Sequence, residues 1–196
     1  MQICRHTLAA SPADWFTHRA RLVALLAACL CGCANDDVER TAAAAASLSP
    51  AASIYVAVSA DGRFADLTYP GSGQRLAELI VAAFDPYVNR AERAAEAQPL
   101  SDAMADARAG GFTYLAMPRI LRWEDRSADW TGLADQAAVR LALIEVRSGR
   151  AADIAVIVGD DDGSNRGQPD DRLVAPLARY TAALVSKGAE PASVAR

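Results

Sequence analysis

The chain has 196 residues, 52% of them hydrophobic, and a formal net charge of −4 at pH 7. This length suits one domain that can bury an ordinary apolar core. The acidic balance, with no run of Arg or Lys after residue 33 and Lys187 as the one lysine, argues against nucleic acid as a partner.

Cysteine and histidine are confined to the start of the chain. All 4 cysteines and both histidines lie at or before Cys33. The remainder therefore has no thiol or imidazole for a zinc, copper or haem site of the usual types, for a Ser-His-Asp or Cys-His nucleophile, or for a structural disulfide. We expect a domain without a metal, a cofactor or a disulfide.

The N-terminal segment predicts a lipoprotein signal. Two arginines precede an apolar run over residues 22–30, and small residues then lead to Cys33. The run is shorter than the roughly 20 residues of a membrane-spanning helix. We predict a signal peptide over residues 1–32 and acylation of Cys33, with palmitate among the acyl groups. Cys29 is the alternative site, although it leaves only a short hydrophobic core before the cut.

Three further regions follow from composition. Residues 33–51 predict the lipidated N-terminus and a flexible tether, because the alanine tract over residues 42–46 offers at most one small apolar face. Residues 187–196 predict a disordered tail. Between them, residues 52–186 predict a single α/β periplasmic domain.

The first half of this domain predicts two strand-helix pairs. Residues 54–58 are apolar and largely β-branched, which favours a buried strand. From Ser72 onward, apolar side chains three and four positions apart predict an amphipathic helix with Ser72 as its N-cap. A weak strand over residues 90–97 leads to a second helix between Pro99 and Gly110, with Leu100, Met104 and Ala107 on one side.

The second half begins with a strand that contains a proline. Residues 112–117 predict a strand that continues past Pro118 to Trp123. Because proline has no N–H to give to a ladder, the strand should lie at an edge or be bulged at that point.

A hairpin and a helix complete the domain. Residues 138–146 and 154–158 predict two antiparallel strands joined by a turn at Ser148-Gly149. Apolar positions over residues 173–185 predict a closing helix, capped by Asp170 or Asp171. The order β-α-β-α-β-β-β-α predicts an α/β (α+β) fold with a single mixed sheet and helices packed on it.

The segment from Phe112 to Arg126, FTYLAMPRILRWEDR, carries a family resemblance, together with Trp130-Thr131-Gly132 and Asp135. It resembles the signature of a family of uncharacterised Gram-negative lipoproteins known only as a domain of unknown function. Earlier matches at Ile54-Tyr55-Val56-Ala57 and Asp61-Gly62-Arg63-Phe64 extend the similarity over most of residues 52–186. The resemblance implies no activity. In fold alone, the predicted strand order is similar to small periplasmic α/β modules such as the curli secretion lipoprotein.

A glycine-rich turn is a candidate anion site. Gly71, Ser72, Gly73 and Gln74 open a predicted helix, whose free N–H groups and dipole favour an anion. The turn lacks the lysine of a phosphate-binding loop. Glycine beside an N-cap more often serves only to make the turn.

The densest polar and aromatic cluster is a candidate recognition site formed by Trp123, Glu124, Asp125, Arg126, Trp130 and Asp135. Read functionally, the tryptophans stack on a sugar ring or a partner's side chain while paired carboxylates act as acid and base. Read structurally, Arg126 pairs with Glu124 or Asp125 to hold a β-turn, and the tryptophans cover the end of a sheet. The structural interpretation is the favoured one.

An acidic loop invites a calcium interpretation. A calcium loop starting at Asp160 would place Asn165 where glycine is required and Asp171 where a bidentate glutamate belongs. A solvated loop is therefore favoured over a metal site.

These observations predict a non-enzymatic lipoprotein that binds a protein partner or serves envelope assembly from the periplasmic face of the outer membrane. Ala34 after the acylated cysteine fits outer-membrane export by resemblance to general lipoprotein sorting. The expected partners are membrane lipid, through the acylated N-terminus, and an envelope protein. Two alternatives remain: a carboxylate-dependent hydrolase of envelope glycans acting through Glu124, Asp125 or Asp129, and a small-ligand or anion sensor that uses the turn at residues 71–74.

Overall fold

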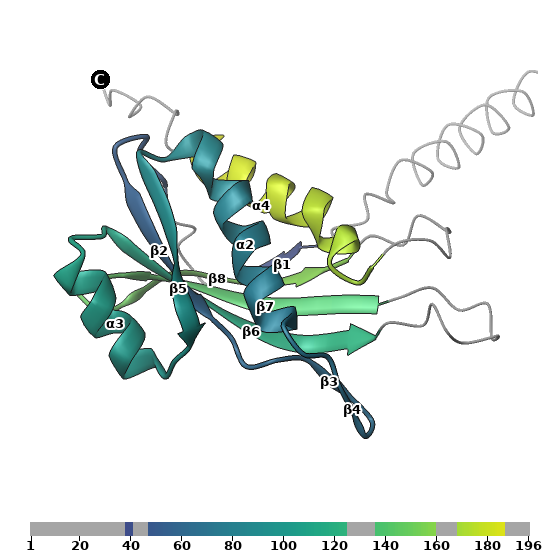
Figure 1. Ribbon diagram of the computed structural model, residues 1–196. Helices are drawn as coiled ribbons and strands as arrows, with labels where there is room; N and C mark the ends of the chain where they lie inside the picture. Colours follow the sequence, from purple (N-terminus) through teal and green to yellow (C-terminus); the bar gives the residue numbers. More distant parts are fainter. Residues whose placement is uncertain (1–37, 41–46, 125–135, 160–167, 187–196) are drawn as a thin grey trace, which may run out of the picture. The chain divides into compact units, whose positions relative to one another are not determined.

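The computed structural model describes residues 38–40, 47–124, 136–159 and 168–186 (Figure 1). Within them, a six-stranded sheet has the order β1-β8-β7-β6-β2-β5, and β3 and β4 form a separate two-stranded ribbon. The strands are β1 (Val38–Arg40), β2 (Ser53–Val58), β3 (Arg63–Phe64), β4 (Leu67–Thr68), β5 (Arg90–Ala97), β6 (Tyr114–Glu124), β7 (Gln136–Glu145) and β8 (Ala151–Val158). The helices are α2 (Ser72–Phe84), α3 (Leu100–Ala109) and α4 (Val174–Ser186), with short 3₁₀ helices η1 (Asp85–Tyr87) and η2 (Asp171–Leu173).

The strand pairing confirms the predicted fold class. β2 pairs in parallel with both β5 and β6, whereas the β6–β7, β7–β8 and β1–β8 pairs are antiparallel. The parallel strands are connected through α2 and α3, because a parallel connection needs a crossover. The result is one mixed sheet in which β2, α2, β5, α3, β6, β7, β8 and α4 follow the predicted order.

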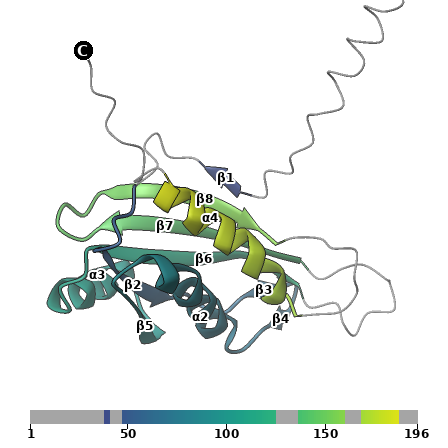
Figure 2. The same ribbon diagram turned by 90° about the horizontal axis from the view of Figure 1, so that it is seen from above.

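Helices α2 and α4 lie side by side on one face of the sheet (Figures 1 and 2). Their side chains bury the main core against alternate residues of the strands. The core stripes are Leu76, Ile80 and Phe84 on α2, Leu177, Tyr180 and Leu184 on α4, and Val139, Leu141 and Leu143 on β7. The rings of Phe84 and Tyr180 meet edge to face, with centroids 6.4 Å apart.

Helix α3 lies on the opposite face and covers only part of it. Ala103, Met104 and Ala107 pack with Leu115 of β6 and Ile144 of β7 in a smaller second cluster. Leu100, expected on the buried side of this helix, is instead 49% exposed. The buried stripe of α3 is therefore shorter than the sequence pattern predicted.

The predicted stop of α3 at two glycines is confirmed. Gly111 has a φ of 68°, a conformation that favours glycine. The N–H groups of Gly111 and Phe112 donate to the carbonyl oxygens of Arg108 and Ala107 at 3.1 and 2.9 Å. These two bonds form a Schellman ending, which satisfies carbonyl groups that the helix leaves free.

Helix α2 begins one residue earlier than predicted, because Ser72 was expected to be the N-cap. Its N-cap is Gly71, with a φ of 78°, and Ser72 is the first helical residue. The Ser72 hydroxyl donates to the Tyr69 carbonyl oxygen at 2.7 Å and accepts the Gly62 N–H at 2.8 Å. Ser72 therefore ties the preceding loop together and does not cap the helix. Before α4, Asp170 takes the N-cap position of η2 without a side-chain capping bond.

Strand β6 explains how the sheet accommodates Pro118. The pairing of β6 with β2 covers residues 114–116, so at Pro118 the described sheet continues only on the β7 side. The expected edge position is thus confirmed locally, although β6 is otherwise an inner strand. The bulge lies further on, between Ile120 and Arg122.

Part of the predicted tether contacts the domain. Val38–Arg40 forms β1, which pairs antiparallel with β8 at the edge of the sheet. Leu48 is 1% exposed, and its N–H donates to the Leu184 carbonyl oxygen at 3.2 Å. These residues therefore correct the expectation of a tether that is flexible throughout. Residues 33–37 and 41–46, and the tail predicted at 187–196, lie outside the described residues.

Candidate functional site

The candidate anion turn before α2 is occupied by a carboxylate of the chain itself. Both Asp61 oxygens accept backbone N–H groups, one from Gly71 at 3.1 Å and one from Gly73 at 3.0 Å. A negative charge at this helix N-terminus is favourable for the reasons that suggested an anion site. The geometry therefore gives these N–H groups an internal partner, and Gln74 lies beyond them on the exposed side of the turn.

Gly73 allows the segment after β2 to lie close to the start of α2. A Cβ at that position would lie 2.1 Å from the Ser59 carbonyl oxygen. Hence the segment after β2 and the start of α2 can touch only because residue 73 has no side chain.

Trp123 lies in the main core, with an exposed fraction of 0%. The bulge between Ile120 and Arg122 adds one residue to β6, and this reverses the face that the following side chains meet. A Cβ on Gly62 would lie 2.6 Å from that of Trp123, so the loop before β3 packs closely over it. The indole is therefore unavailable for stacking on a sugar or a partner, contrary to the functional interpretation of this residue.

Glu124 is also 0% exposed, and one of its oxygens accepts the Arg122 Nε–H at 2.6 Å. The predicted pairing of Arg126 with Glu124 or Asp125 involves residues outside the described ranges and stays a prediction. The other members of the predicted recognition cluster, Asp125, Arg126, Trp130 and Asp135, lie outside the described residues, as does Asp129. For them, recognition and acid-base roles stay predictions.

The structure shows a different candidate surface, which we call the open face. It consists of the exposed or half-buried residues of β6, β7 and β8 that point away from α2 and α4. Leu115 and Ile144 also point away from those helices, but they are buried beneath α3. Strand register groups them into three cross-strand rows: Met117, Ala142 and Ile154; Arg119, Arg140 and Val156; Arg122, Ala138 and Val158. Val158 is 45% exposed, and Leu121, at the bulge beside this face, is 48% exposed.

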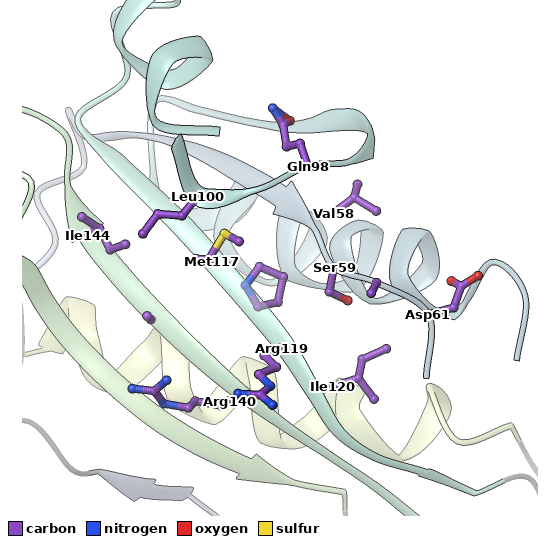
Figure 3. Close-up of a pocket in the computed structure, with 13 residues that line it drawn as sticks. Val58, Ser59, Asp61, Gln98, Leu100, Met117, Arg119, Ile120, Arg140 and Ile144 are labelled. Carbon is purple, nitrogen blue, oxygen red and sulfur yellow. The ribbon is translucent and has the colours of Figure 1, made fainter. Parts of the chain in front are cut away.

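A pocket of about 480 Å³ opens at the end of the open face nearest α3 (Figure 3). Its walls come from residues 58–61 after β2, from Gln98 and Leu100 at the start of α3, and from β6 and β7. Figure 3 shows Arg119 and Arg140 close to one another on neighbouring strands, and Leu100, Met117 and Ile144 towards the other end of the pocket. The pocket therefore has a cationic side and an apolar side.

Gln98 in the pocket wall is held by a polar cluster that links β2 to α3. Its amide nitrogen donates to an Asp106 oxygen at 2.8 Å, and the Tyr55 hydroxyl lies 3.4 Å from both Gln98 Oε1 and Asp106 Oδ2. Burial raises the pKa of Tyr55, and the Asp106 carboxylate adds to the rise. Burial, with a contribution from Glu145, likewise raises the pKa of Tyr114 in β6.

The open face and its pocket were missed from the sequence because their residues are adjacent only through strand register. The available signal was β8, where Ile154, Val156 and Val158 alternate with the core residues Ala155 and Ile157. A strand that is apolar on both faces needs a cover on each. Among the described elements, α3 covers only one end of the second face.

No group of three or more His, Cys, Asp or Glu side chains within the described ranges is placed to hold a metal ion. The acidic loop from Asp160 to Asn165 and the candidate acylation sites Cys29 and Cys33 lie outside those ranges. In the described part of the chain, every helix is too short or too polar to cross a membrane.

Solved structures with a similar fold include PelC dodecamers from Paraburkholderia phytofirmans. A variant PelC has 18% identity and a TM-score of 0.59, covering 75% of this chain and 97% of that one. Another PelC dodecamer has 16% identity and a TM-score of 0.58, covering 75% and 95%. Lipoprotein GNA1162 from Neisseria meningitidis has 14% identity and a TM-score of 0.42, covering 74% and 99%. At these identities the PelC likeness shows the fold alone.

No curated protein sequence matches the chain. The family described as Domain of unknown function (DUF4823) matches residues 46–184, which include nearly all of the described domain. This match agrees with the resemblance carried by the segment from Phe112 onward. The chain therefore belongs to the DUF4823 family.

Proposed function

We propose that this protein is a lipid-anchored envelope module that acts by assembling with further copies of itself, without catalysing a reaction. The observation that carries the proposal is the open face. Its rows combine exposed or half-buried apolar side chains of β6, β7 and β8, and among the described elements only α3 covers an adjoining part. An apolar sheet face of this kind is stabilised by contact with another protein surface.

The fold supports a second copy as the occupant. Two PelC structures of the same fold are dodecamers, and this chain covers nearly the whole of each. Assemblies of identical subunits repeat the same contact on every copy, so a modest apolar face on each protomer can contribute to all of these contacts.

The described polar groups support binding over hydrolysis. Asp61, the one carboxylate among the residues that line the pocket, has both oxygens bonded to backbone N–H groups. Glu124, proposed from the sequence as an acid or base, is buried against Arg122. Neither carboxylate is arranged to exchange protons with a substrate.

The anchor and location rest on the sequence. A short apolar run that ends at Cys33 supports acylation there, and Ala34 supports delivery to the outer membrane. Several acyl chains on one cysteine would give stable attachment. The domain would then act from the periplasmic face of that membrane.

Photo-crosslinking in the native envelope tests this proposal. Benzoylphenylalanine is placed at Val158, on the open face, and as a matched control at Ala178, an exposed position of α4. The expected result is an adduct at Val158 whose mass is a multiple of that of the protein, with little adduct at Ala178. A Val158 adduct to a different protein would contradict self-assembly while keeping a binding role. Equal or absent adducts at both positions would contradict both.

A further inference from the structure

We propose that the pocket beside α3 binds a small organic anion, a carboxylate or phosphate monoester attached to an apolar group, between Arg119 and Arg140. This site goes beyond the proposed assembly, because it concerns a soluble ligand and not a second protein chain. The pocket volume of about 480 Å³ lies within the range of small-molecule sites.

The two arginines form a cation pair that has no counter-ion among the described residues. Arg119 and Arg140 are direct cross-strand partners in the β6–β7 register, and both are exposed. Side chains at such positions start only about 5 Å apart, and like charges there repel. Neither guanidinium forms an ion pair or a hydrogen bond with the described residues, whereas neighbouring Arg122 is paired with Glu124. An anion bound between them would remove this repulsion.

The nearest pocket carboxylate cannot supply that charge. Asp61 lines the same pocket, but its oxygens are held by the Gly71 and Gly73 N–H groups at the start of α2. Moving it to the arginines would leave those helix N–H groups without their anion. An anion that binds between the arginines would therefore come from outside the described residues.

The remaining walls define the other half of the ligand. Leu100, Met117 and Ile144 form an apolar side next to the arginine pair (Figure 3). Guanidinium groups bind carboxylates and phosphates through paired N–H donors, and an adjoining apolar wall favours a ligand with a hydrocarbon part. Gln98, fixed by Asp106, adds a neutral polar group at the rim.

Ser59 adds an independent observation. It lines the pocket, is 8% exposed, and its hydroxyl has no hydrogen-bond partner among the described residues. Buried hydroxyl groups are normally satisfied by protein, water or ligand. This wall of the pocket is therefore incomplete without a further polar group.

The test uses the full acylated chain in phosphatidylcholine nanodiscs, with benzoate and phenyl phosphate as probes and neutral benzamide as their uncharged counterpart. Saturation-transfer NMR gives the Kd of each probe. We expect saturable binding of the two anions and much weaker binding of benzamide. Each of Arg119→Gln and Arg140→Gln should raise the anion Kd by about tenfold, the loss expected for a charge-assisted hydrogen bond.

Two further variants separate the halves of the site. Arg150→Gln, which removes an exposed charge in the β7–β8 turn, should leave the anion Kd unchanged. Ala142→Leu fills the half-buried apolar side and should weaken all three probes. Circular dichroism and thermal unfolding of every variant confirm that the fold is retained.

The proposal is overturned by any of three results: benzoate and phenyl phosphate show no saturable binding, benzamide binds as well as they do, or the double variant Arg119→Gln/Arg140→Gln binds them unchanged.

Repeating the titration in nanodiscs that contain phosphatidylglycerol identifies the source of the anion. An unchanged Kd supports a soluble ligand, whereas loss of benzoate binding would mean that a lipid headgroup fills the pocket. Each of these readouts is independent of the crosslinked mass that tests self-assembly.

Discussion

At the scale of single residues, the side chains that the sequence suggests as most reactive have structural roles in the fold. Asp61, Trp123 and Glu124 each satisfy a local need, as a helix anion, a core ring and an arginine partner. Arg119 and Arg140 have no such partner among the described residues, and neither was a candidate site residue predicted from the sequence. Their proximity depends on register and could not be found from spacing along the chain.

Loss of the Asp61 carboxylate should weaken the start of α2. Asp61→Ala removes the acceptor of the Gly71 and Gly73 N–H groups, and we expect the free energy of unfolding to fall by about 1–2 kcal/mol in urea denaturation. Asp66→Ala, an exposed substitution in the nearby β3–β4 turn, should change it by less than about 0.5 kcal/mol.

Phosphate provides a second measurement on the Asp61 variant. Because the vacated N–H groups form an anion cradle, added phosphate should raise the thermal midpoint of Asp61→Ala more than that of the wild type. An equal rise in both proteins would argue that these N–H groups do not form an anion site once the carboxylate is gone.

Trp123 tests the assignment of the indole to the core. Trp123→Ala should lower the free energy of unfolding by about 3–5 kcal/mol, because it removes a side chain that is 0% exposed. Leu121→Ala, on the bulge two residues earlier and 48% exposed, should cost much less. If urea denaturation gave the two variants equal stability, the Trp123 side chain would not be part of the core. The recognition hypothesis, which needs an exposed indole, would then be supported.

At the scale of elements, strong periodicity was sufficient to predict the order of strands and helices. Alternation in β7 and the three-and-four spacing in α2 each mark one buried face over many residues. The ribbon of β3 and β4 has two residues in each strand, too few for any period to show. The bulge in β6 was equally invisible beyond the hint from Pro118, because a single added residue changes orientation without changing composition.

The polar cluster of Tyr55, Gln98 and Asp106, which links β2 to α3, predicts that stability depends on pH. The raised pKa of Tyr55 means that the unfolded chain loses this proton before the folded chain does. The contribution of Tyr55 to the free energy of unfolding is therefore complete below the ordinary tyrosine pKa of 10.0. It is lost as the pH rises through the higher pKa of Tyr55 in the folded protein. The free energy of unfolding should fall above about pH 10 for this reason.

Urea denaturation at neutral and alkaline pH measures this effect. Tyr55→Phe should show a smaller alkaline fall than the wild type, and Asp106→Asn should also reduce it, since Asp106 contributes to the raised pKa. An alkaline fall that is identical in all three proteins would assign it to other groups, of which Tyr114 is the first to examine.

At the scale of the whole molecule, the domain and the predicted anchor lie in separate parts of the sequence. The family match begins at residue 46, after the apolar run and both candidate acylation sites. The domain places its open face and pocket on the side of the sheet away from α2 and α4. A lipid anchor would concentrate these surfaces on one membrane, which favours contacts between copies that are weak in solution.

The anchor gives the last prediction. Cys33→Ser should abolish acylation and move the protein from the membrane to the soluble periplasmic fraction, because the acyl chains on Cys33 are the proposed attachment. Mass spectrometry of the N-terminal peptide, with membrane fractionation, measures both changes. Cys29→Ser is the matched control and should leave acylation and location unchanged. The opposite pattern would move the lipid to Cys29, and an unmodified N-terminus in the wild-type soluble fraction would contradict anchoring altogether. Crosslinking at Val158 in the released Cys33→Ser protein should also decline, since assembly then depends on three-dimensional encounter.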